Sequence, residues 1–80
     1  MMTNNEIATQ LLVAASRLNF EDAFHPEHDL KELASELAML SNEVSNVPVE
    51  PAAPRVAVIR DKVAAAGITD VVEILDSLQF

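Results

Sequence analysis

The chain has no cysteine, no tryptophan and no tyrosine, and only one of its 80 residues is glycine. Without cysteine it has neither a disulfide nor a thiolate ligand for zinc, which fits a reducing compartment such as the cytoplasm. A single glycine is too few for the glycine-rich loops that hold phosphate groups. The scarcity of aromatic residues and glycine favours helices over strands.

Long apolar runs and basic residues are also scarce. The longest apolar run, Leu11 to Ala15, is far shorter than the roughly 18 residues that a membrane-spanning helix needs, and the N-terminus lacks the basic start of a signal peptide. We therefore expect a cytoplasmic protein without a membrane segment. Thirteen acidic residues and five basic ones give a net charge of −8. Because lysine and arginine supply most affinity for phosphates, we expect no direct nucleic-acid binding.

The most regular feature that is present is an apolar repeat in the middle of the chain. Its residues are spaced by three, four, three and four positions, which is typical of a helix that packs against another helix. The same repeat could form the inner face of a helical hairpin within one chain or a seam between two chains. The five residues of this seam are Leu30, Leu33, Leu37, Leu40 and Val44.

The first half of the chain predicts an antiparallel helical hairpin over residues 1–46. Thr3 and Glu6 form a capping-box pattern, so a helix should begin there and run to about residue 24. Pro26 should end the turn that follows and open a second helix over about residues 26–45. The first helix offers the second a stripe of apolar residues: Ile7, Leu11, Ala14 and Leu18.

The second half predicts a short helical pair over residues 54–80. The prolines of residues 47–53 indicate an extended linker, and Pro54 is placed to open a third helix. Gly67 should end this helix in the left-handed conformation that a C-cap requires, and Thr69 should cap a fourth helix. We therefore predict one all-α domain, residues 1–80.

No group of residues predicts catalysis, since the serines are scattered and no nucleophile motif is present. We expect no enzyme activity and no cofactor. His25 and His28, with Asp29 and Glu32 nearby, have the chemistry of metal ligands. Their spacing matches no established ligand pattern, so we expect a solvated turn and no metal.

Charged residues give two candidate surfaces. An acidic face on the second helix could bind a basic partner, imitate a nucleic-acid backbone or only keep the protein soluble; it comprises Glu32, Glu36 and Glu43. A basic group at the start of the third helix should pair with the acidic first half, or else bind an anion or a phosphorylated ligand. This group comprises Arg55, Arg60 and Lys62.

Apolar residues outside the helical stripes favour a homo-oligomer, since a small monomer would expose them. They are Val13, Met39, Val58, Val72 and Ile74. The sequence thus favours a non-enzymatic, homo-oligomeric interaction module that regulates or inhibits a partner protein, a role that suits a phage or mobile element. Two alternatives stay open: an oligomer that sequesters a small anionic or nucleotide ligand, and an acidic nucleic-acid mimic.

Overall fold

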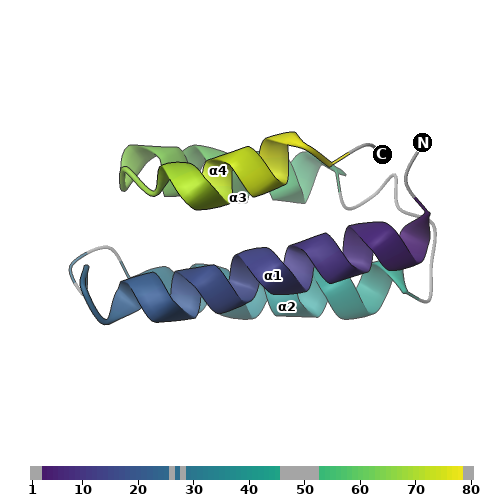
Figure 1. The fold of residues 1–80 in the computed structure, drawn as a ribbon, viewed down its shortest axis with the longest axis horizontal. Helices are drawn as coiled ribbons and strands as arrows, with labels where there is room; N and C mark the ends of the chain where they lie inside the picture. Colours follow the sequence, from purple (N-terminus) through teal and green to yellow (C-terminus); the bar gives the residue numbers. More distant parts are fainter. Residues whose placement is uncertain (1–2, 26, 28, 46–52, 79–80) are drawn as a thin grey trace.

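A computed structural model describes residues 3–25, 27, 29–45 and 53–78 of the chain. These residues form four helices and no strand, which confirms the all-α prediction. The long helices α1 and α2 lie side by side in one layer, and the shorter helices α3 and α4 form a second layer against them (Figure 1). The helices are α1 (Asn4–Asp22), α2 (Leu30–Val44), α3 (Ala53–Ala65) and α4 (Thr69–Asp76).

The seam of α2 packs inside the chain. Leu33 is 8% exposed and the other four seam residues are 0% exposed. The stripe predicted on α1 is buried as well, and α1 and α2 contact each other more extensively than any other two helices. The sequence left open whether the seam lies within one chain or between two chains. In the structure it forms the inner face of the hairpin.

The predicted start of α1 is confirmed. The hydroxyl oxygen of Thr3 accepts a hydrogen bond from the backbone N–H of Glu6 at 3.2 Å, so one of the unpaired N–H groups of the first turn is satisfied. The same hydroxyl donates to the carboxylate of Glu6 at 3.3 Å. The helix ends at Asp22, two residues before the predicted end, and Phe24 continues the chain as a turn.

The predicted start of the second helix is wrong by four residues. The helix begins at Leu30 because Asp29 adopts the left-handed conformation, with φ of 51° and ψ of 43°. A residue in that region cannot continue a right-handed helix. Pro26, on which the prediction depended, lies outside the described residues, as do His28 and residues 47–52 of the predicted linker.

The end of α3 has the predicted glycine cap. Gly67 has φ of 80°, its N–H donates to the Ala64 carbonyl at 3.0 Å, and the Ile68 N–H donates to the Val63 carbonyl at 3.3 Å. These two bonds define a Schellman motif, and Ile68 and Val63, the positions between which such a motif makes its apolar contact, are both buried.

The two helices on either side of this motif begin close to the predicted positions. The third helix begins at Ala53, one residue before Pro54. Thr69 is the first residue of α4, and Ile68, which has no polar side chain, occupies the cap position. The prediction that Thr69 caps the helix is therefore wrong by one residue.

One apolar core joins all four helices. The short helix α4 contributes Val71 and Leu75, which are buried together with residues of α1, α2 and α3. Val72 and Ile74, which fell outside the predicted stripes, pack against the margin of this core. The other three apolar residues outside the predicted stripes, Val13, Met39 and Val58, stay exposed.

A buried hydrogen bond also joins the two long helices. The side chain of Ser41 is 3% exposed, and its hydroxyl donates to the backbone carbonyl of Ala8 at 2.7 Å. We expect Ser41→Ala to lower the free energy of unfolding by about 1 kcal/mol, the net value of one hydrogen bond. Urea denaturation measures this difference, with the exposed Ser35→Ala as the matched control. Equal midpoints for the two variants would contradict a stabilising role for this bond.

Candidate protein-interaction surface

An apolar patch with a charged border lies where α2 and α3 meet, and we call it the α2–α3 face. At its centre Met39 of α2 is 59% exposed and Val58 of α3 is 54% exposed. Both line one shallow groove. The other lining residues of this groove are Glu36, Ile59, Arg55 and Lys62.

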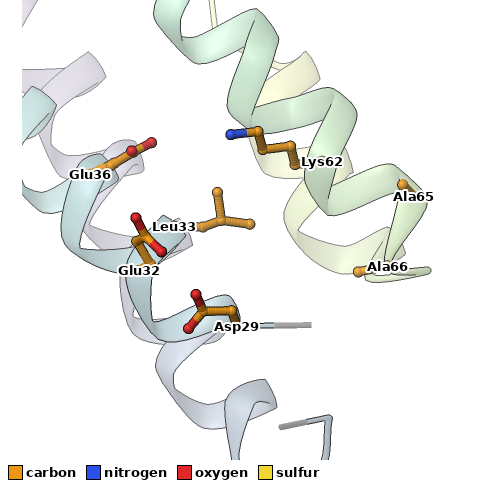
Figure 2. A pocket seen from close by; sticks show the side chains of 7 residues that line it. All are labelled: Asp29, Glu32, Leu33, Glu36, Lys62, Ala65 and Ala66. Carbon is orange, nitrogen blue, oxygen red and sulfur yellow. The ribbon is translucent and has the colours of Figure 1, made fainter. Parts of the chain in front are cut away.

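Acidic residues continue this face toward the start of α2. Glu32 and Glu36 are one helical turn apart and line an adjoining hollow, together with Asp29 and Leu33. Figure 2 shows their carboxylates along the α2 side, with Lys62 extending from α3 on the opposite side. Three carboxylates thus share the hollow with one ammonium group.

The carboxylates of this hollow repel one another. A hydrogen bond between the side chains of Glu32 and Asp29, and then the negative charge of Asp29, raise the pKa of Glu32 above its ordinary value. A raised carboxyl pKa means that the folded state binds this proton more tightly than the unfolded chain does. The tighter proton binding by Glu32 therefore stabilises the folded state at acidic pH, and this contribution is lost as the pH rises through the raised pKa. The charged form of Glu32 therefore does not stabilise the fold at neutral pH.

Glu43, the third residue of the predicted acidic face, differs from the other two. Its carboxylate accepts a hydrogen bond from the guanidinium of Arg55 at 2.7 Å, and this ion pair joins α2 to α3. The Glu43 side chain is 45% exposed and that of Arg55 is 51% exposed, so the pair contributes at most about 1 kcal/mol to stability. The acids that remain for a partner are Glu32 and Glu36.

The three basic residues predicted as one group lie on two sides of α3. Arg55 and Lys62 are two turns apart and both line the α2–α3 face. Arg60 is displaced from Arg55 by about 140° around the helix. Its guanidinium donates two hydrogen bonds to Asp76 of α4, at 2.9 and 3.2 Å. Arg55 thus pairs with the acidic first half, as the sequence predicts, whereas Arg60 pairs with α4 instead. The alternative of an anion site stays a prediction.

Of the two histidines in the turn between α1 and α2, the structure describes His25. His25 lies 3.6 Å from a carboxylate oxygen of Glu21 and 3.9 Å from one of Glu27. Within residues 3–25, 27, 29–45 and 53–78, no three histidine or acidic side chains are grouped so that they could hold a metal ion.

A second apolar surface lies on the side of α1 away from the core, and the sequence reasoning did not identify it as a surface. We call it the outward face of α1. Phe20 is 61% and Phe24 is 64% exposed, with ring centres 5.2 Å apart. Leu12 and Val13 are exposed about two turns before Phe20. The sequence did hold a signal, because Leu12, Val13 and Phe20 fall outside the buried stripe of α1 and Phe24 follows the end of that helix.

Comparisons with known proteins name no relative of this chain. No protein-family model, no curated protein and no solved structure matches it. Among the described residues, no helix has both the length and the apolar character to cross a bilayer.

Proposed function

We propose that this chain is a non-enzymatic interaction module that binds a basic partner protein through the α2–α3 face. The observation that carries the proposal is the exposure of Met39 and Val58 in one groove bordered by charged residues. An apolar centre inside a polar border is the usual composition of a protein interface. So small a module is suited to regulate or inhibit the partner that it binds.

The charges around this face support a basic partner. Four carboxylates, those of Asp29, Glu32, Glu36 and Glu43, and two cations, Arg55 and Lys62, surround the apolar centre. Such a field attracts a basic surface and orients it during the encounter, while the apolar contact sets most of the affinity. A small anionic ligand fits less well, since the charge of Arg55 is already compensated by Glu43.

The test is association with the partner, identified by affinity capture from the source organism and then purified. We expect the double variant Glu32→Gln and Glu36→Gln to associate about threefold more slowly, or slower still, at low salt, with a weaker salt dependence. The melting temperature should not fall, because the variant removes the repulsion around Glu32.

The matched control removes the same number of charges from α4, with Asp70→Asn and Glu73→Gln. These residues are exposed on a helix away from the α2–α3 face. The control should keep the association rate of the wild type. Equal rates for the wild type and both double variants at low salt would show that the acidic face does not guide a partner.

A further inference from the structure

The outward face of α1 is an apolar surface separate from the one that carries the proposed function. A shallow hollow on it is lined by Leu12, Val13 and Phe20, with the small Ser16 between them. Thr9 and Arg17 complete the lining. Thr9, Val13, Ser16 and Phe20 are spaced by four, three and four residues, so they follow one side of the helix, as a helix–helix interface requires.

The charge distribution indicates which molecule covers this face. Arg17 is the single charged residue between Thr9 and Phe20, in a chain whose net charge is −8. Two copies of so acidic a chain repel each other over most of their surfaces. They meet the least repulsion where carboxylates are few. The residues that line the hollow on the outward face of α1 include no carboxylate, and Asp70 and Glu73 of α4 lie in a separate hollow on the other side of Arg17.

The ends of α1 indicate the orientation of the second copy. Glu21 and Asp22 lie at its C-terminal end, the last turn has no basic residue, and the helix dipole makes that end more negative. A parallel pair would bring two such ends together. An antiparallel pair separates them and lays the C-terminal end of each α1 toward the N-terminal half of the other.

We propose that two copies of the chain form an antiparallel dimer through the outward face of α1, with the two-fold axis close to Ser16. In this arrangement the Phe20 side chain of each copy packs against Val13 of the other. The small Ser16 allows the two helices to approach closely at the axis. The α2–α3 face of each copy stays free for a partner.

Single cysteines test the axis cleanly, because the chain has none of its own. A disulfide forms only between residues whose Cα atoms come within about 7 Å. Ser16→Cys should therefore give a covalent dimer under mild oxidation. Thr9→Cys, on the same face, should not, because an antiparallel pair separates its two copies by about 21 Å along the helices. Efficient cross-linking at position 9 would contradict the antiparallel pair.

Sedimentation equilibrium tests the dimer itself. The wild type should sediment with twice the single-chain mass of 8.7 kDa. Phe20→Asp should sediment as single chains with an unchanged circular dichroism spectrum, because position 20 is exposed within each chain. A wild type that sediments as single chains at micromolar concentration would overturn the proposal and leave the partner-binding proposal intact. A Phe20→Asp variant that is still dimeric would show that another face forms the dimer.

Discussion

Replacing Leu37 by aspartate should unfold the protein. Leu37 is the middle residue of the α2 seam and is 0% exposed, surrounded by the apolar residues of the core. Burying an unpaired carboxylate there costs several kcal/mol. Small domains have total stabilities of about 5–15 kcal/mol, and a chain of this size is expected near the lower limit. Far-UV circular dichroism should show loss of most of the helical signal at 25 °C.

The control for this variant is Ser35→Asp, two residues earlier on the exposed side of the same helix. It introduces the same side chain without burying it, so the helical signal and the melting temperature should be close to those of the wild type. A folded Leu37→Asp with the melting temperature of the control would show that the core is not built on this seam.

Replacing Gly67 by valine should have the second largest effect on stability. Gly67 has φ of 80°, and a Cβ atom at this position would have no atom within 4 Å other than those of residue 67 and its chain neighbours. The effect therefore comes from the backbone and not from crowding. An L-residue in the left-handed region costs roughly 1–2 kcal/mol, and a β-branched residue is among the least tolerated there. Thermal denaturation should show a clear fall in melting temperature.

Asparagine provides the control at the same position. It tolerates the left-handed conformation better than other residues with a side chain, so Gly67→Asn should lose less stability than Gly67→Val. Equal melting temperatures for the two variants would mean that residue 67 can leave the left-handed conformation without cost, and that the Schellman motif does not hold α3 and α4 together.

Features of the fold that depend on local chemistry could be predicted from the sequence. The capping pattern at Thr3, the seam of α2 and the glycine cap at Gly67 each depend on residues a few positions apart, and the structure has all three. The start of α2 could not be predicted from Pro26. The helix starts at Leu30 because Asp29 has a left-handed backbone, and no side-chain pattern in the sequence predicts that conformation.

Features that depend on helix packing were harder to predict. The hydrogen bond from Ser41 to the Ala8 carbonyl joins residues 33 positions apart, so it requires the register of α1 against α2. The pairing of Arg60 with Asp76 likewise requires the placement of α4. The residues of the α2–α3 face stand out in the sequence, since Glu32 and Glu36 were grouped as acidic and Met39 and Val58 as apolar outside the stripes. The groove that joins Met39 to Val58 depends on how α3 lies against α2.

The most direct test of the proposed function is site-specific photo-cross-linking in the source organism. A photo-reactive amino acid at position 39, the centre of the α2–α3 face, should give one discrete adduct with another protein. The same amino acid at position 73, exposed on α4, should not give that adduct. Adducts that are absent from position 39, or identical from both positions, would contradict a specific partner at the α2–α3 face.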